Sequence, residues 1–303
     1  MSISTIDLQF TGRASTIAAY LVPHSHGAVL IECGPSSTLP AVEAALAACG
    51  LTSGDVTDVF ITHIHFDHAG SSGWWAQQGA RVHVHPFGAP HLCNPEKLIA
   101  SATRIYGDQM DTLWGKILPI PAEKLVTHSD GDCVEVGGLQ IEVLDTPGHA
   151  NHHFVYVCED TAFTGDIGGV RLPESSRHMR LPTPPPEFHL ETWRATLGRL
   201  QALQAAGKFT SVALTHFGRY PDAAWHLETV ARKLDALESW MAATLPQESD
   251  AEEIRRSFRA WEQAQATNDG LSDAEVAALM TASPSGMSAD GAARYWRKHR
   301  AQS

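Results

Sequence analysis

The feature that most constrains the fold is a cluster of histidines directly behind a short apolar run. The apolar run is VFI at residues 59–61, and the segment THIHFDHAG follows it at residues 62–70. A short apolar run bounded in this way is consistent with a buried β-strand. Four side chains that can bind a metal ion therefore fall within six residues, where a strand is expected to end: His63, His65, Asp67 and His68.

The spacing within this cluster indicates ligands for two adjacent ions. His63 and His65 are two residues apart, so on an extended segment their side chains project from the same side. Asp67 and His68 follow where the chain is expected to turn into a helix, which points them in a different direction. Imidazole is a common neutral ligand of zinc and iron, and a carboxylate offsets the charge of a dication.

Three further metal-capable side chains follow other apolar runs. His149 lies in DTPGHA, Asp166 in FTGD and His216 in ALTHFG, each just past the end of a predicted strand. Strands of one sheet deliver such side chains to a shared edge, where functional loops gather. We therefore expect these three residues to converge with the cluster at residues 63–68.

From residue 5 to about residue 220, short apolar strands alternate with turns and a few helices, in two passes of similar style. This pattern predicts an α+β fold, a four-layer αβ/βα sandwich of two mainly antiparallel sheets covered by helices. After Pro221 the strand signals stop, and Ser249-x-x-Glu252 and Ser272-x-x-Glu275 match helix capping boxes. The sequence therefore predicts a domain at residues 1–220 and a helical C-terminal region at residues 221–303.

Two insertions interrupt the strand pattern. Residues 94–124 are predicted to be mainly helical, and the proline-rich residues 171–189 are predicted to form an irregular, stiffened loop. The substrate-binding residues are not identified by the sequence, and ordinary packing is the favoured explanation for the side chains near these insertions. The candidates for lining a substrate pocket are His91, Arg104, Tyr106, Met110, Trp114, Arg171 and His178.

Charge and composition exclude several classes of partner. The formal net charge of -12 repels phosphate backbones and anionic lipid, so neither nucleic acid nor a membrane is expected as a partner. The N-terminus lacks a signal-peptide pattern and no apolar stretch approaches the roughly 18 residues of a membrane span, which predicts a cytoplasmic protein. Five scattered cysteines are predicted to be buried free thiols. The apolar surface of residues 106–114 and of the helical tail would allow a homodimer.

In order along the chain, HxHxDH, PGH, GD and a late strand-end histidine resemble the ligand motifs of the metallo-β-lactamase-fold superfamily. The resemblance spans residues 5–220 and implies that residues 1–220 are a catalytic domain. It also implies two divalent metal ions, zinc first, with iron or manganese as alternatives. The ligand sets that it implies are His63, His65 and His149 at one ion and Asp67, His68 and His216 at the other, with Asp166 bridging both.

Particular residues favour one branch of this superfamily. Exported β-lactamases carry a cysteine at the position of Asp166, whereas His68 and Asp166 look more like the glyoxalase II, lactonase and phosphodiesterase branches. His65 differs from the glutamate of flavodiiron oxidoreductases. Lactonases that act on acyl-homoserine lactones typically carry a tyrosine where this chain has Gly169, which weakens that assignment. The branch implies a small-molecule ester, thioester or lactone as substrate.

The implied reaction is hydrolysis by a hydroxide that bridges two dications about 3.5–4 Å apart. Asp67 and Asp166 are the candidate catalytic residues, because either carboxylate could accept a proton from the bridging water. One alternative is an oxidoreductase resembling persulfide dioxygenases, with a single iron held by His63, His149 and Asp166. A non-catalytic metal scaffold is disfavoured, because structural zinc sites are usually closed and rich in cysteine.

Overall fold

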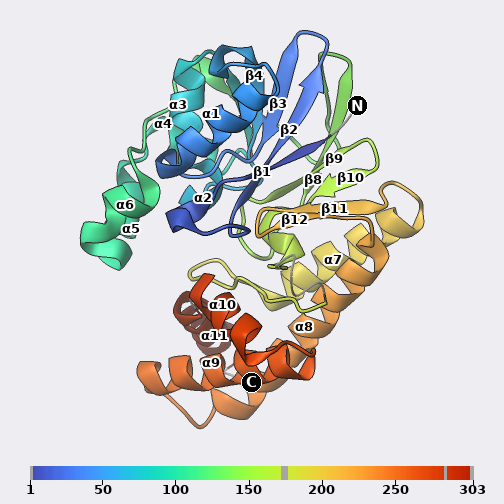
Figure 1. Cartoon of the computed structure of the whole chain (residues 1–303). Helices are drawn as coiled ribbons and strands as arrows, with labels where there is room; N and C mark the ends of the chain where they lie inside the picture. Colours follow the sequence, from blue (N-terminus) through green and yellow to red (C-terminus); the bar gives the residue numbers. More distant parts are fainter. Residues whose placement is uncertain (1–2, 172–176, 283–284, 301–303) are drawn as a thin grey trace. The chain divides into compact units, whose positions relative to one another are not determined.

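The structure is a computed structural model that describes residues 3–171, 177–282 and 285–300. The chain divides into two compact units (Figure 1). The first contains Met1–Asp145 and His152–Gly165, and the second contains Thr146–Asn151 and Asp166–Ser303. The predicted boundary at residue 220 stays a prediction. Part of the loop predicted at residues 171–189, residues 172–176, lies outside the described residues.

The first unit contains a six-stranded mixed sheet in which the strands follow one another in chain order. The first three strands pair antiparallel and the last four pair parallel. Parallel neighbours need a crossover connection, which helices supply here. The prediction of two sheets is confirmed, although this first sheet is mixed. Its strands are β1 (Ser4–Asp7), β2 (Ala18–His24), β3 (Gly27–Ile31), β4 (Val56–Phe60), β5 (Arg81–Val84) and β6 (Leu125–Thr127).

Four more strands of the first unit form consecutive antiparallel hairpins of a second sheet. Gly137 and Gly138 make the two-residue turn of the first hairpin, and both have positive φ angles, 56° and 90°. A two-residue turn with positive φ at both positions matches the twist of the strands it joins and strongly favours glycine. The strands are β7 (Cys133–Val136), β8 (Leu139–Asp145), β9 (Phe154–Cys158) and β10 (Thr161–Phe163).

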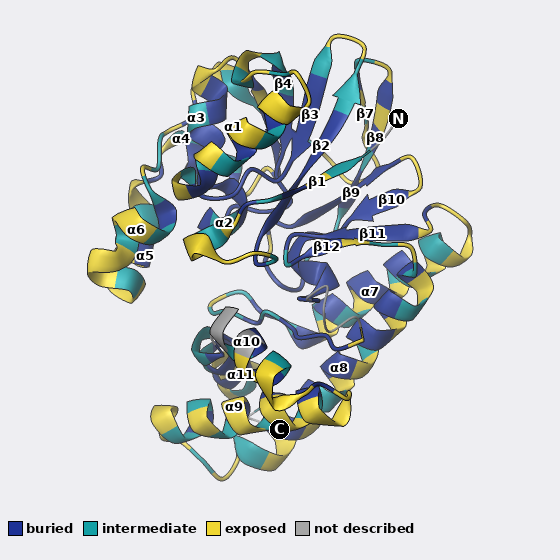
Figure 2. Ribbon diagram, viewed as in Figure 1, coloured by how far each residue is buried: buried dark blue, intermediate teal, exposed yellow. Residues whose placement is uncertain are grey.

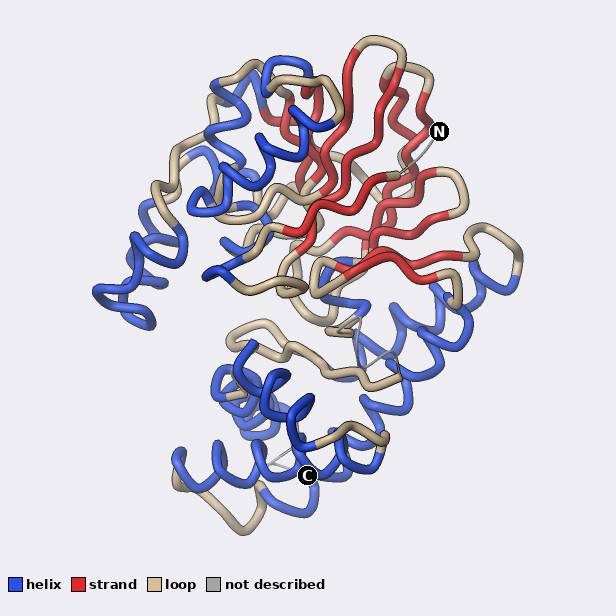
Figure 3. Tube along the Cα trace, viewed as in Figure 1, coloured by secondary structure: helices blue, strands red, loops and turns tan. Residues whose placement is uncertain are grey.

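The two sheets of the first unit face each other across an aromatic layer. The ring of Tyr156 on β9 meets the ring of Phe60 on β4 edge-on at 5.2 Å, and its hydroxyl donates a hydrogen bond to the carbonyl oxygen of Ile61 at 3.0 Å. Because side chains alternate along a strand, Val59 points to the opposite face of β4. There it joins a core that includes Val42 and Trp75. Figure 3 shows helical segments beside the strands of the first unit.

The helices of the first unit cover the mixed sheet and build the predicted insertion. Residues 94–124 contain α5 and α6, as the sequence predicted. The helices are α1 (Leu39–Ala48), α2 (Phe66–Ala69), α3 (Ser72–Gln77), α4 (Ala89–Cys93), α5 (Glu96–Tyr106) and α6 (Met110–Trp114), with 3-10 helices η1 (Phe10–Gly12), η2 (Ser36–Thr38), η3 (Ser53–Asp55), η4 (Gly107–Gln109) and η5 (Ala122–Lys124).

The second unit is mainly helical and includes the predicted helical C-terminal region. Its long helix α8 has a buried side and an exposed side (Figure 2), with buried residues such as Leu227, Leu234 and Met241 at helical spacing. Within the described residues, every helix is too short or too polar to cross a membrane. The elements are η6 (Gly165–Gly168), α7 (Leu190–Ala205), β11 (Ser211–Leu214), β12 (Gly218–Tyr220), α8 (Ala223–Thr244), α9 (Ala251–Asn268), α10 (Asp273–Ala282) and α11 (Gly286–His299).

Candidate metal centre

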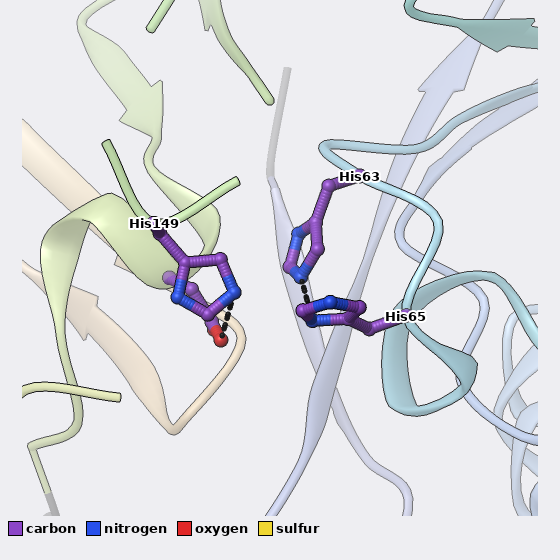
Figure 4. Close-up of side chains that lie close together, drawn as sticks. His63, His65 and His149 are labelled. Carbon is purple, nitrogen blue, oxygen red and sulfur yellow. Dashed lines mark hydrogen bonds and ion pairs between the residues drawn. The ribbon is translucent and has the colours of Figure 1, made fainter. Parts of the chain in front are cut away.

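Two histidines of the HxHxDH segment lie side by side in the first unit. The segment leaves β4, and His65 is the last extended residue before α2 begins at Phe66. The Nε2 atom of His63 lies 2.9 Å from the Nδ1 atom of His65 (Figure 4). Two lone pairs at this distance repel each other, so the pair needs a proton or a cation between its nitrogens. His63 is fully buried and His65 is half-buried.

The other two residues of the segment lie on the short helix α2. The Nε2 atom of His68 lies 3.7 Å from a carboxylate oxygen of Asp67. The Nδ1 atom of His68 lies 3.1 Å from a carboxylate oxygen of Glu32. When Nδ1 carries the proton and donates it to Glu32, Nε2 keeps the lone pair that a metal ion requires.

Glu32 is a candidate functional residue that the sequence analysis missed. It follows β3 directly, is only 1% exposed, and also accepts a hydrogen bond from the hydroxyl of Thr62. Carboxylates are almost never fully buried unless they are paired. The one available signal was its position at the end of the apolar run AVLI, where an acidic residue is unexpected.

A Glu32→Gln variant is expected to weaken metal binding by about 10- to 100-fold, the usual effect of losing a partner that orients a ligand histidine. The amide keeps the shape of the side chain but removes the charge that favours the Nδ1–H form of His68. Competition with a chromophoric chelator measures the dissociation constant. Glu43→Gln, at an exposed carboxylate on α1, is the control. Equal dissociation constants for the two variants would rule out this role for Glu32.

Three of the predicted ligands meet in the second unit. One carboxylate oxygen of Asp166, Oδ2, lies 3.3 Å from the Nε2 atom of His149 (Figure 4). The other oxygen, Oδ1, lies 3.5 Å from the Nε2 atom of His216. Asp166 and His149 are buried, and His216 is half-buried. The Asp166 carboxylate therefore lies close to two imidazole rings, with a different oxygen facing each.

Backbone contacts orient these ligands. The Nδ1–H group of His149 donates a hydrogen bond to the carbonyl oxygen of Pro182 at 2.8 Å. The lone pair of Nε2 therefore faces Asp166. His216 lies between β11 and β12, and its carbonyl oxygen accepts a hydrogen bond from the amide of Arg171 at 2.7 Å. Orientation of a ligand histidine through its second nitrogen is the usual arrangement around metal ions.

The candidate pocket residues of the first insertion form an aromatic cluster. Tyr106 and Trp114 pack edge-on at 5.1 Å, and Trp114 also contacts Phe66 of the HxHxDH segment. Met110 joins the same cluster. Burial, and next the negative charge of Asp67, raise the pKa of the Tyr106 hydroxyl to about 12, so this hydroxyl is protonated at neutral pH.

The remaining candidates fall outside such a cluster. In the second unit, Arg171 pairs with Asp222 at 2.8 Å and His178 with Asp269 at 2.7 Å. In the first unit, His91 is half-buried on α4 and Arg104 is exposed on α5.

A second network of histidines in the first unit is held together by hydrogen bonds among His83, Asp58 and His128. His83 lies 2.8 Å from a carboxylate oxygen of Asp58 through Nε2 and 2.8 Å from the Nε2 atom of His128 through Nδ1. Burial lowers the pKa of His83, and it lowers that of His128 to about 4, so both rings are neutral at pH 7. Both ring nitrogens of His83 therefore have hydrogen-bond partners within the protein.

The predicted ligand residues suit a divalent metal ion. They provide neutral imidazole nitrogens and anionic carboxylate oxygens without a thiolate, a donor set typical of zinc, iron or manganese rather than of a structural cysteine site. In the first unit, ligand atoms of His63 and His65 lie within 4.8 Å of each other, as do those of Asp67 and His68. In the second unit, ligand atoms of His149 and Asp166 do so.

These observations define a class of protein, an α+β chain with two facing sheets and with histidine and carboxylate side chains that could hold a metal ion in the segments that follow its strands. Residues 12–206 match the family model of the Metallo-beta-lactamase superfamily. The chain belongs to this superfamily, which confirms the resemblance inferred from the motifs.

Comparison with curated proteins identifies partial relatives. The Metallo-beta-lactamase fold-containing protein ST1585 of Sulfurisphaera tokodaii is 28% identical over 145 residues, which cover 46% of this chain and 54% of the relative. A hydroxyacylglutathione hydrolase of Aeromonas hydrophila is 28% identical over 190 residues, 61% of this chain and 56% of the relative. One from a Methylobacterium species is 32% identical over 172 residues, 54% and 51%. The chain spans about half the length of these relatives.

Solved structures share the fold over most of the chain. A metallo-beta-lactamase family protein from Thermus thermophilus has a TM-score of 0.67 at 23% identity, and the match covers 88% of this chain and 91% of that one. ST1585 from Sulfolobus tokodaii has a TM-score of 0.60 at 20% identity, with 88% and 98% covered. At these identities the likeness establishes the fold alone.

Proposed function

We propose that the protein is a dinuclear metal hydrolase that cleaves an ester, thioester or lactone of a small molecule. The observation that carries the proposal is the placement of Asp166, with Oδ2 at 3.3 Å from His149 and Oδ1 at 3.5 Å from His216. A ligand shared by two cations must offer one oxygen to each, and the two oxygens of this carboxylate lie near two different candidate ligand histidines.

The proposed ligand sets follow the motif order. The adjacent His63 and His65, and the adjacent Asp67 and His68, support the division of the HxHxDH segment between two ions. We assign His63, His65 and His149 to one ion, Asp67, His68 and His216 to the other, and Asp166 to both.

The bound ions would lower the pKa of a water molecule toward neutrality and polarise the carbonyl oxygen of the substrate. The protein side chains have two further tasks. Glu32 and the carbonyl of Pro182 hold His68 and His149 in the tautomer whose Nε2 lone pair can bind an ion. Asp67, whose side chain is 25% exposed, is the proposed acceptor for the proton that the attacking water loses.

The relatives favour a thioester among the three substrate classes. Several of them are hydroxyacylglutathione hydrolases, whose name describes the cleavage of an acyl group from glutathione. In the aromatic cluster beside Phe66, Trp114 is buried, whereas Tyr106 is partly exposed, so we propose that Tyr106 contacts an apolar part of the substrate. Gly169, in place of the tyrosine typical of acyl-homoserine lactonases, makes a lactone a weaker candidate.

A panel assay tests the proposal with purified, metal-loaded protein. We expect turnover of glutathione thioesters or other activated esters, and weaker or no turnover of lactones, phosphodiesters and β-lactams. Oxygen uptake with a glutathione persulfide, together with a single bound iron, would instead identify the oxidoreductase alternative. A protein without turnover of any ester, thioester or lactone would refute the proposed class.

Removal of the metal is expected to abolish hydrolysis. Elemental analysis of the purified protein should find about two ions per chain, the number that a dinuclear site requires. Dialysis against a chelator should reduce turnover to background, and zinc, manganese or iron should restore it, because the ligands bind ions reversibly. Full activity in metal-free protein would contradict a metal-dependent mechanism.

A further inference from the structure

The short turn that carries Asp166 is held from outside by two buried side chains. Asp166 lies in the short helix η6 (Gly165–Gly168). The carbonyl groups of Ile167 and Gly168, at the end of this helix, need hydrogen-bond donors from elsewhere in the protein. The indole Nε1–H of Trp193 on α7 donates to the carbonyl oxygen of Ile167 at 3.1 Å. The Nε2–H of His226 on α8 donates to the carbonyl oxygen of Gly168 at 2.8 Å. Both donor residues are 0% exposed.

Trp193 also contacts the loop that carries His149. The two rings meet edge-on with their centroids 6.0 Å apart. Gly148 lies so close to the helix that a Cβ atom at this position would come within 2.5 Å of the Cα atom of Trp193. One turn further along α7, the hydroxyl of Thr196 donates to the carbonyl oxygen of Pro147 at 2.6 Å. Helix α7 therefore contacts two of the three ligand-bearing segments of the second unit, those of His149 and Asp166.

The protonation state of His226 agrees with a fixed donor role. Burial lowers its pKa to about 4, so the ring is neutral at pH 7 and carries one proton. Because a carbonyl oxygen can only accept, that proton lies on Nε2, in the hydrogen bond to Gly168. The ring stacks on Tyr220 at 6.4 Å, which further restricts its rotation.

These contacts determine where the Asp166 carboxylate points. Its two oxygens must face His149 and His216 at the same time, and a small rotation of the turn would move one of them out of reach. Ligands hold a metal tightly only when the groups around them fix their orientation. We infer that Trp193 and His226 are positioning residues that set the orientation of Asp166 toward both ions, an inference that rests on the proposed function.

Three variants test this inference through metal affinity. Trp193→Phe keeps an aromatic ring but removes the Nε1–H donor, and His226→Leu removes the donor to Gly168. Each is expected to weaken zinc binding about tenfold, the lower end of the effect of losing an outer contact of a metal site. His226→Gln retains an N–H at a similar position and should restore most of the affinity. Chelator competition gives the dissociation constants.

The visible spectrum of the cobalt-loaded protein gives a second readout, because its bands report the coordination geometry. We expect Trp193→Phe and His226→Leu to shift these bands. Trp240→Phe is the matched control, because it removes an indole donor to Ser257 elsewhere in the second unit. It should lower the melting temperature without changing the zinc affinity or the cobalt spectrum.

The outcomes separate this inference from the proposed function. Wild-type protein that binds none of zinc, manganese and iron would refute the proposed function itself. Wild-type binding with unchanged affinities and spectra in Trp193→Phe and His226→Leu would overturn the positioning role alone. If His226→Leu does not fold, Trp193→Phe decides, since it preserves most of the side-chain volume.

Discussion

An Asp166→Asn variant is expected to lose about a thousandfold in turnover, in the range seen when one preorganised charged or polar group is removed from an active site. It should also retain fewer than two ions. The amide has nearly the shape of the carboxylate, but it lacks the negative charge and can offer only one oxygen. The ions proposed at His149 and at His216 would then no longer share an anionic ligand.

Turnover and metal content measured on the same preparation check this prediction. Asp235→Asn is the control, since this exposed carboxylate of the second unit pairs with Arg194 at the surface. Exposed pairs contribute about 0–1 kcal/mol to stability, so the control should keep its activity and its ions. An Asp166→Asn protein with two tightly bound ions and normal turnover would exclude a shared ligand at this position.

The second large effect concerns stability. A Glu262→Ala variant is expected to lower the free energy of unfolding by about 3–5 kcal/mol, the usual cost of breaking a buried ion pair. Glu262 on α9 accepts two hydrogen bonds from Arg180, each at 2.8 Å. Both side chains are deeply buried, since they are only 4% and 5% exposed. Without the carboxylate, the guanidinium would remain buried without its main counter-charge.

Urea denaturation followed by circular dichroism measures this loss. Glu253→Ala is the control, because this residue pairs with Arg256 on the exposed side of the same helix and should change stability by less than about 0.5 kcal/mol. The double variant Arg180→Met/Glu262→Leu should recover much of the loss, because apolar side chains often replace a buried pair without cost. Similar stabilities for Glu262→Ala and Glu253→Ala would disprove the assigned contribution.

Local sequence signals predicted the secondary structure well where they were strong. The Ser272-x-x-Glu275 pattern forms a capping interaction, in which the amide and hydroxyl of Ser272 donate to Glu275. The Ser249-x-x-Glu252 pattern was wrong, because Asp250 is the N-cap and accepts from the amides of Glu252 and Glu253. Serine and aspartate are about equally good N-caps, so the pattern alone cannot decide between neighbours.

The direction in which neighbouring strands pair was harder to predict from the sequence. Apolar runs such as VFI at residues 59–61 predicted strands, and the structure has β4 there, between its neighbours β3 and β5. These strands pair parallel, which a run of apolar residues does not reveal by itself. Direction depends on the helical connections between the strands, such as α1 between β3 and β4.

The sequence by itself determined the superfamily and the candidate ligands, because closely spaced residues such as His63 and His65 have directions that local geometry fixes. Only the tertiary structure revealed the residues that orient those ligands. Glu32 lies 36 residues from His68, and His226 lies 58 residues from Gly168. Contacts at such separations depend on how whole helices and strands pack, and no spacing within a short segment encodes that packing.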